Sequence, residues 1–270
     1  YNDSVSAILY GNHPRLQSIK TSNIDRVSYD RIWQIYNERF SDASGFKMVL
    51  VGNIDMEKLR PLLCQYVATL PSKGKRDTVK DTYPAVRNAN ETHTFKKKMN
   101  TPSTLVSVFY TFDEPYTAKA DLALDVFKRV LTIAYTDSIR EEKGGTYGVS
   151  VQSELDRNSK PTTLIKIGFR TDPAKYEMLM PIVYRQIENI ANNGPLAESM
   201  AKVKTYLLKA YQQNAITNNY WDYVIYNNLR HGVDFHTGYE DLLNGITAQD
   251  IQQIAKDMLK SNRRIEITMM

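Results

Sequence analysis

Cysteine, long apolar runs and the zinc-peptidase motif H-x-x-E-H are scarce or missing in this sequence. The single cysteine, Cys64, excludes an internal disulfide, and its apolar surroundings, Leu62–Val67, predict a buried small side chain. No run approaches the roughly 18 apolar residues that a membrane-spanning helix needs, so we expect no membrane span. Without H-x-x-E-H or its inverse, no histidine pair shares a helix face, so we expect no metal and no other cofactor in this chain.

Other chemistry-bearing motifs are also missing. The sequence has no phosphate-binding loop, no G-x-S-x-G elbow and no G-x-G-x-x-G turn, which argues against nucleotide-binding and serine-hydrolase classes. His231 and His236 stand five residues apart after a helix, a spacing that favours a surface loop over a zinc site. No basic residue adjoins Cys64 in the sequence, which argues against a thiol nucleophile.

The charge is moderately basic, +5 from 35 basic and 30 acidic residues. The dense basic runs, Lys73 to Lys80 and Lys96 to Lys98, lack the interleaved aromatic residues of a single-strand binder. We therefore expect solvated faces and no nucleic-acid partner. The chain begins Tyr1-Asn-Asp-Ser without a methionine or an apolar leader, which suggests a fragment or a trimmed chain, so any targeting segment could have been removed.

A polar, charged stretch between Pro71 and Pro84 shows neither helical nor strand periodicity and indicates a linker. We therefore divide the chain into residues 1–72, a linker 73–91 and residues 92–270. The first unit is predicted to hold a helix from Ser28 to Phe40, a strand Lys47–Val51 and a second helix through Leu59 and Tyr66. One strand is too little for an independent domain, so this unit is the closing part of a larger one.

The second unit shows a fuller α+β pattern. Its strands are predicted at Thr104–Phe112, Tyr147–Gln152 and Thr162–Phe169, in the order of an antiparallel meander, with a last strand at Ile265–Met269. Helical spacing marks a long helix between the first two strands, breaking near Ala134. It also marks two helices that begin near Pro173 and Pro195. Two further helices are predicted at Asn219–Arg230 and Ala248–Leu259. The expected fold is a mainly antiparallel sheet covered by helices.

A weak repeat links the two units at a constant offset of 219 residues. Each copy starts with a hydroxyl residue suited to the helix N-cap, Ser28 or Thr247, and continues through an amphipathic helix into a strand. Amphipathic helices can coincide by chance, so chance similarity and true duplication both stay open at this point.

Several segments, in this order along nearly the whole chain, resemble the C-terminal half of M16 metallopeptidases, the pitrilysin and insulysin family: Tyr10–Pro14, Val51–Asp55, Tyr66–Pro71, Arg140–Tyr147 and Trp221. The stretch Arg140-Glu-Glu-Lys-Gly-Gly-Thr-Tyr147 is the most specific of them. The chain looks closest to the long bacterial zinc proteases. The resemblance implies an M16 peptidase-like fold and a clam-shaped chamber whose N-terminal half binds zinc.

The resemblance also implies site residues. Tyr147 would donate its hydroxyl toward the scissile carbonyl oxygen, and Arg140 would hold the peptide backbone with its planar donors. Alternatively, these residues have only structural roles: Arg140 ends a solvated helix, Gly144-Gly145 is a glycine C-cap and Tyr147 is an ordinary aromatic residue of a strand. A stripe of aromatic residues either lines a peptide-binding wall or packs between helices: Tyr206, Tyr211, Tyr220, Trp221, Tyr223 and Tyr226.

Two functions remain. In the first, the chain is the substrate-binding half of a zinc metalloendopeptidase, partnered by a catalytic N-terminal half on the same polypeptide or in a separate subunit. In the second, it is a non-catalytic M16-like scaffold or peptide-binding subunit. Retention of Arg140 and Tyr147 favours the first. In both, the isolated chain is expected to be inactive, with zinc in the missing half and peptide as substrate. The residues themselves leave the compartment unknown, and the resemblance makes the bacterial periplasm plausible.

Overall fold

The structure is a computed structural model that describes residues 1–270 except 79, 81–82, 99, 142–147 and 158–159, and only the backbone of 139–141. The helices are α1 (Asn2–Tyr10), α2 (Thr21–Ile24), α3 (Tyr29–Phe40), α4 (Met56–Tyr66), α5 (Ala118–Tyr135), α6 (Tyr176–Asn193), α7 (Ala197–Asn214), α8 (Asn218–His231), α9 (Tyr239–Asn244) and α10 (Ala248–Lys260). The strands are β1 (Asn90–Phe95), β2 (Thr104–Asp113), β3 (Val149–Leu155), β4 (Thr162–Thr171) and β5 (Arg264–Met269).

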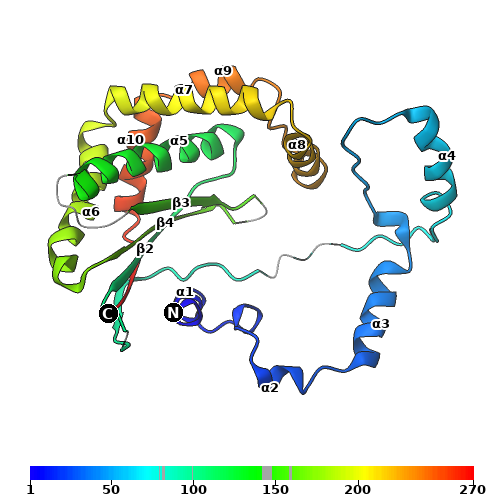
Figure 1. Ribbon diagram of the computed structural model, residues 1–270, viewed down its shortest axis with the longest axis horizontal. Helices are drawn as coiled ribbons and strands as arrows, with labels where there is room; N and C mark the ends of the chain where they lie inside the picture. The colour runs from blue at the N-terminus through cyan, green and yellow to red at the C-terminus, as the bar shows by residue number, and fades with distance from the viewer. Residues whose placement is uncertain (79, 81–82, 99, 142–147, 158–159) are drawn as a thin grey trace.

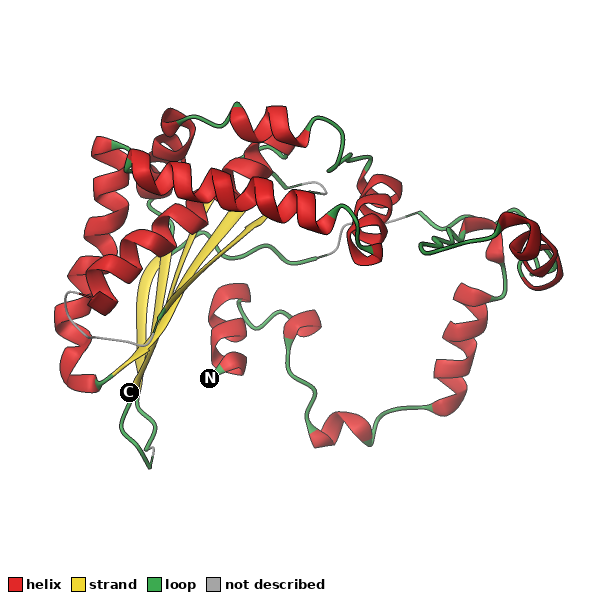
Figure 2. Ribbon diagram, turned by 45° about the horizontal axis from the view of Figure 1, so that its top comes forward, coloured by secondary structure: helices red, strands yellow, loops and turns green. Residues whose placement is uncertain are grey.

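In the described part of the chain, the strands form one sheet in the order β1-β5-β2-β4-β3. The pairs β2–β4, β2–β5 and β3–β4 are antiparallel, and β1–β5 is parallel. Helices α5, α6 and α10 cover one side of this sheet, α7 lies over α5, and α1 lies on the other side of the sheet (Figures 1 and 2). The expected α+β fold, a mainly antiparallel sheet covered by helices, is confirmed.

The main core lies between the sheet and its helix layer. Alternation in β2 and β4 turns Val108, Ile165 and Ile167 toward the helices, and all three are fully buried. Phe127 on α5 and Ile187 on α6 meet them with no exposed surface. Each such side chain contributes about 1.5–3 kcal/mol by leaving water, so this layer holds the second unit together.

The predicted meander is wrong. Strand β3 follows β2 in the sequence but pairs with β4, so β4 lies between β2 and β3. The long α5 explains the difference, because it crosses the sheet and delivers β3 to the far edge. Its predicted break near Ala134 is confirmed, since α5 ends at Tyr135 and continues as the π-helical turn Thr136–Glu141.

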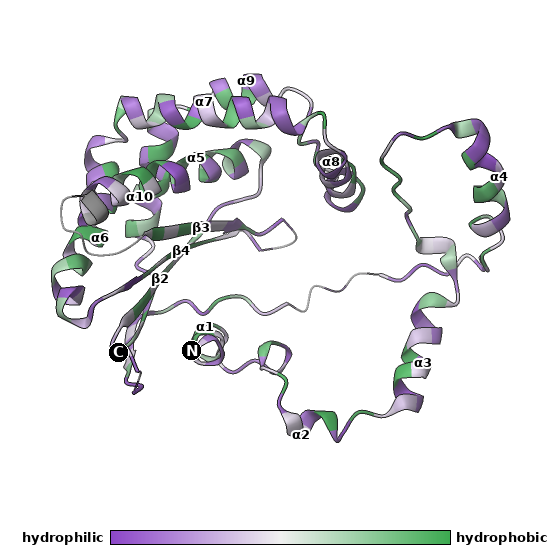
Figure 3. Ribbon diagram, in the orientation of Figure 1, coloured by the Kyte–Doolittle hydropathy of each residue, from purple (hydrophilic) through white to green (hydrophobic). Residues whose placement is uncertain are grey.

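The first unit runs out from the sheet as separate helices joined by loops (Figure 1). The predicted helices are confirmed as α3 and α4. Lys47–Val51 is not a strand, because no described segment pairs with it. Cys64 on α4 is exposed, contrary to the predicted burial, because α4 makes no extensive contact with another described helix or strand. Apolar residues on α3 and α4 therefore lie far from the sheet and its core (Figure 3).

Candidate functional site

The π-helical turn at the end of α5 carries one of the two predicted site residues. Arg140 lies on the backbone of this turn, its side chain is outside the described residues, and so is the whole of Tyr147. The turn is anchored upstream, because Ser138 donates to the Ala134 carbonyl at 2.7 Å and accepts from Gln186 of α6 at 2.6 Å. π-helical turns recur at functional sites, so this position is consistent with a functional role for Arg140.

Tyr135 fixes the end of α5 against α6. Its ring is fully buried and its hydroxyl donates to the Val183 carbonyl at 3.0 Å. Burial raises the pKa of Tyr135 well above its ordinary value, so the hydroxyl stays a donor at any physiological pH. This anchor holds the helix five residues before Arg140. The buried core thereby determines where the chain leaves α5.

Strand β3 begins two residues after Tyr147, at Val149. Among the described strands it pairs only with β4, so it is an edge strand of the sheet. The Arg140–Tyr147 stretch therefore connects an anchored helix end to a sheet edge. An edge strand of this kind can accept an extended peptide through main-chain hydrogen bonds.

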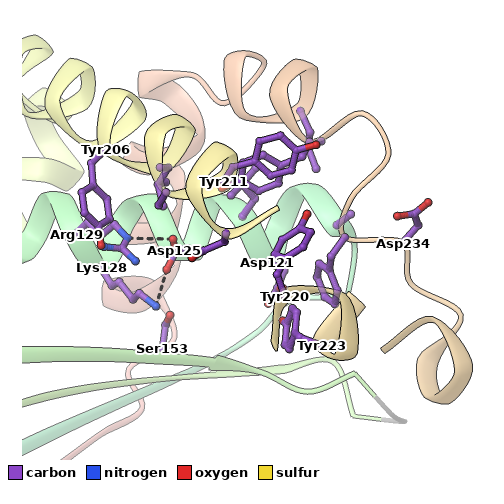
Figure 4. Close-up of a pocket in the computed structure, with 18 of the residues that line it drawn as sticks. Asp121, Asp125, Lys128, Arg129, Ser153, Tyr206, Tyr211, Tyr220, Tyr223 and Asp234 are labelled. Atoms are coloured by element: carbon purple, nitrogen blue, oxygen red, sulfur yellow. Dashed lines mark hydrogen bonds and ion pairs between the residues drawn. The ribbon is translucent and has the colours of Figure 1, made fainter. Parts of the chain in front are cut away.

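A pocket of about 440 Å³ lies at the other end of β3, between α5, α7, α8 and the loop before α9 (Figure 4). Its lining includes charged residues from three segments, Asp121, Asp125, Lys128, Arg129, Arg157 and Asp234. Four tyrosines of the predicted aromatic stripe also line it: Tyr206, Tyr211, Tyr220 and Tyr223. Most of the stripe therefore lines a pocket, and Tyr211 of α7 also stacks on Tyr239 of α9, so both interpretations of the stripe stay open.

Arg157, just after β3, joins three elements around this pocket. Its guanidinium donates to Asp121 of α5 at 3.2 Å and to Asn227 of α8 at 2.8 Å, and it lies 4.9 Å from the Phe235 ring centroid. Asn227 is buried and donates in turn to the Tyr223 carbonyl at 2.7 Å. Burial raises the pKa of Asp121, and the charge of Arg157 offsets only part of that effect.

A second cluster lies one turn further along α5. Asp125 accepts from Lys128 at 2.6 Å and from Arg129 at 3.0 Å, and Arg129 also lies over the Tyr206 ring at 4.7 Å (Figure 4). Asp121 and Asp125 thus share one helix face but each has a basic partner. The Asp-x-x-x-Asp spacing of Asp121 and Asp125 is the sequence signal from which this face could have been predicted.

The histidine pair does not act as a unit. His231 ends α8, while His236 lies in the loop, where its Nδ1 contacts the Tyr220 hydroxyl at 2.9 Å and its ring packs against Trp221 at 4.7 Å. Burial raises the pKa of Tyr220 to about 12. The described residues include no cluster of three or more metal-ligating side chains.

A shallower hollow continues the pocket along α5. It shares Lys128, Arg129 and Tyr206 with the pocket and adds apolar residues, among them Ile133 and Val151. Val151 belongs to β3, as does Ser153 in the pocket itself. We call the two together the β3 groove. It has a polar end near Arg157 and an apolar end toward the start of β3.

Replacing Arg157 with methionine is expected to destabilise the chain by about 2 kcal/mol, because Asn227 and Asp121 both lose their donor inside a half-buried site. The matched control is Arg129→Met, which leaves Asp125 paired with Lys128 and should cost less than about 1 kcal/mol. Urea unfolding of both variants measures the difference. Equal losses would show that Arg157 has no special anchoring role.

Comparison with known proteins gives a consistent family. The family described as the peptidase M16 inactive domain matches residues 26–207. A zinc protease PQQL-like protein of Arabidopsis thaliana is 23% identical over 82% of this chain and 24% of its own length. The probable zinc protease PqqL of Escherichia coli is 25% identical over 65% of this chain and 18% of its own length. The chain therefore spans about a quarter or less of these curated relatives.

Solved structures show the same fold. The periplasmic protease PqqL from Escherichia coli superposes with a TM-score of 0.78 at 18% identity, over 99% of this chain and 30% of that one. A peptidase M16 inactive domain from Pseudomonas fluorescens superposes with a TM-score of 0.71 at 16% identity, over 98% of this chain and 64% of that one. At these identities the likeness concerns the fold alone.

Proposed function

Because this chain belongs to the peptidase M16 inactive-domain family, we propose that it is the C-terminal, substrate-binding half of a zinc metalloendopeptidase. The observation that carries the proposal is the arrangement of the two elements that flank Arg140–Tyr147 in the chain, the anchored end of α5 and the edge strand β3. This stretch leads from the anchored end of α5 into the edge strand β3, which the β3 groove accompanies. A peptide laid along β3 would reach main-chain partners, the groove and both predicted site residues.

In this proposal Tyr147 donates its hydroxyl to the scissile carbonyl oxygen as negative charge develops there. Arg140 orients the peptide by donating to main-chain carbonyls from its planar guanidinium. A phenol and a guanidinium both remain protonated at neutral pH, so both can donate without a proton transfer. These donors stabilise the transition state only when the other half supplies the activated water.

Zinc is assigned to the catalytic N-terminal half. The donor chemistry of this chain supports that assignment, because the acidic pair on α5 is engaged by Arg157, Lys128 and Arg129. None of the four histidines stands in an H-x-x-E-H motif. The metal would polarise the carbonyl and activate water from the opposite side of the bound peptide.

We further propose that residues 1–72 close a first M16-like α/β domain, that 73–91 link it to the next, and that 92–270 form a second. The repeat helices support this division. Ser28 caps α3 by accepting from Arg31 at 3.3 Å, and Thr247 caps α10 by accepting from Asp250 at 3.2 Å, at the same offset of 219. The apolar face of α3 is exposed, which fits a domain completed by further chain.

The compartment is part of the proposal. The Escherichia coli protease of the same fold is described as periplasmic, and we place this chain in the periplasm by analogy. Among the described residues, no helix combines the length and the apolar character that crossing a bilayer requires.

The test compares the isolated chain with a mixture of the chain and the zinc-binding half. The isolated chain is expected to hold no stoichiometric zinc and to leave peptides intact, while mixing it with the H-x-x-E-H half should restore cleavage. Zinc analysis and a fluorogenic peptide assay measure the two properties. Restored peptide binding without any cleavage would favour the scaffold function. Stoichiometric zinc on the isolated chain, held by its own side chains, would contradict the proposal.

A further inference from the structure

Strand β3 turns alternate residues toward the helix layer. Val149 and Leu155 are buried in the main core, and Val151 packs against it. Ser153, on the same face of the strand, lines the pocket. The intervening side chains are exposed on the opposite face: Ser150, Gln152 and Glu154. A side chain that lies beside Val151 or Ser153 on the helix side therefore enters the β3 groove.

A hydrogen bond at the end of β3 shows which of its main-chain groups point toward the open edge. The Asp156 N–H donates to the Thr162 carbonyl at 3.1 Å, and this pair continues the antiparallel register of β3 with β4. In an antiparallel ladder, alternate residues bond to the same neighbouring strand. Counting back in twos from Asp156, the main chain of Gln152 bonds to β4. The N–H and C=O groups of Val151 and Ser153 therefore point toward the open edge.

The two residues that face the groove are thus also the two that offer main-chain partners. A peptide strand added antiparallel to β3 would exchange a pair of hydrogen bonds with Val151 and another with Ser153. Residues directly opposite each other lie on the same face of a sheet, with Cβ atoms about 4.5–5.5 Å apart. Two peptide residues, two positions apart, would then both point into the β3 groove.

The hollow beside Val151 is mainly apolar and measures about 440 Å³. Ile133 of α5 and Val203 of α7 line it together with Val151 and Tyr206. Val203 is buried, whereas Ile133 and Val151 are only partly buried and keep some surface open to the hollow. An aliphatic side chain would gain most there, because it would exchange water for apolar contacts.

The charged side chains that the described structure places around this hollow are all basic: Lys128, Arg129 and Lys202. Lys202 pairs with Glu198 at 2.7 Å. Lys128 and Arg129 share one carboxylate, that of Asp125, at 2.6 and 3.0 Å. This group of three therefore carries one more positive than negative charge, which favours a peptide with an acidic side chain nearby.

The acidic side chains of the adjoining pocket already have donors. Asp121 accepts from Arg157 at 3.2 Å, and the exposed Asp234 accepts from two main-chain N–H groups at 2.8 and 3.0 Å. Lys128 and Ser153 both line this pocket (Figure 4). A carboxylate opposite Ser153 would find a cationic partner in Lys128, whereas a basic side chain there would meet like charge.

We propose that the β3 groove binds an extended peptide as a further antiparallel strand and selects an aliphatic side chain opposite Val151 and an acidic one opposite Ser153. Because the two strands run in opposite directions, the acidic residue precedes the aliphatic residue by two positions in the peptide. Val151, Ile133 and Lys128 determine the specificity. The inference rests on the function proposed above and deepens it, because it names the class of peptide that the substrate-binding half takes.

Peptide binding to the chain tests the selection. The probe is a fluorescein-labelled heptapeptide of serine and threonine with Glu-Thr-Leu at its centre. Replacing the leucine with serine should weaken binding about tenfold, and replacing the glutamate with lysine about threefold. Fluorescence anisotropy measures both affinities. Equal affinities in either comparison, or no binding of the probe, would overturn the proposal.

N-methylation of the peptide tests the strand pairing. The leucine N–H is the group that donates to Val151, so a methyl on that nitrogen should weaken binding about tenfold. The N–H of the preceding threonine points away from β3, so methylating it is the matched control and should change the affinity less than about twofold. Similar losses from both methyl groups would mean that the groove holds side chains without pairing a strand, and the proposal would fail.

Val151→Thr tests the protein side of the same subsite. Threonine keeps the β-branched shape that suits a strand but puts a hydroxyl in the hollow. The preference for leucine over serine should therefore fall from about tenfold to about threefold. Gln152→Thr is the matched control, because it places the same side chain on the exposed face of β3. A preference that Val151→Thr leaves unchanged would contradict the assignment of the subsite.

These measurements report binding alone, so they separate this inference from the proposed function. A complete peptidase that cleaves peptides, built on a chain without this selectivity, would overturn the inference and leave the function standing. A chain that selects these peptides, in a complete protein that does not cleave them, would support the inference and favour the scaffold function.

Discussion

Replacing Tyr147 with phenylalanine is expected to lower kcat of the complete peptidase about 100-fold while changing peptide affinity little. The hydroxyl is proposed to act on an oxygen that gains charge only in the transition state, so its loss should fall on turnover. Phenylalanine keeps the ring and removes only the hydroxyl. Steady-state kinetics with a fluorogenic peptide, together with inhibitor binding, separate the two effects.

Two further variants show whether the loss of turnover is specific to the Tyr147 hydroxyl. Tyr29→Phe removes a hydroxyl from an exposed tyrosine on α3 and should leave kcat unchanged. Arg140→Lys keeps the charge but loses the planar set of donors, so it should raise KM more than it lowers kcat. A Tyr147→Phe enzyme with normal turnover would remove this hydroxyl from the mechanism and favour the plain strand-aromatic interpretation.

The second large effect concerns the repeat. Ile251→Ala on α10 is expected to destabilise the chain by about 2–5 kcal/mol, because Ile251 has no exposed surface and its loss leaves a cavity in the main core. Ile32→Ala at the equivalent position of α3 should change the free energy of unfolding by no more than about 0.5 kcal/mol in this chain, because Ile32 is 53% exposed. Urea unfolding measures both.

The same pair tests the domain division in a longer polypeptide. If a first domain is completed by further chain, Ile32 becomes a core residue there, and Ile32→Ala should cost about 2 kcal/mol or more. Ile251→Ala serves as the internal standard, since its surroundings lie within residues 92–270 and should not change. A cost for Ile32→Ala that stays negligible in the longer protein would argue against the proposed first domain.

Local chemistry explains which elements were predictable. Helices α3 and α10 follow from an N-capping hydroxyl and an apolar stripe within about twelve residues, and β2 and β4 from β-branched runs. Helix α1 was missed, since Leu9 is buried only through strands about a hundred or more residues away. The apolar runs predicted a buried Cys64 and a strand at Lys47–Val51, but Cys64 is exposed and no described strand pairs with Lys47–Val51.

The candidate site likewise contains residues that the sequence predicted and residues that it did not. The family motif marks Arg140 and Tyr147 from the sequence alone, and their roles remain a proposal. No local pattern joins Asp121, Arg157 and Asn227, because they come from three elements that only the folded sheet and helices bring within hydrogen-bonding distance.

By itself, then, the sequence determined the family, the lack of a zinc motif and most helices and strands, because capping, periodicity and short motifs act between near neighbours. The tertiary structure decided the strand order, the β3 groove, the anchoring of Arg157 and the packing of α1 on the opposite unit. These depend on contacts between segments far apart in the chain, where burial and geometry choose among alternatives that local sequence leaves equal.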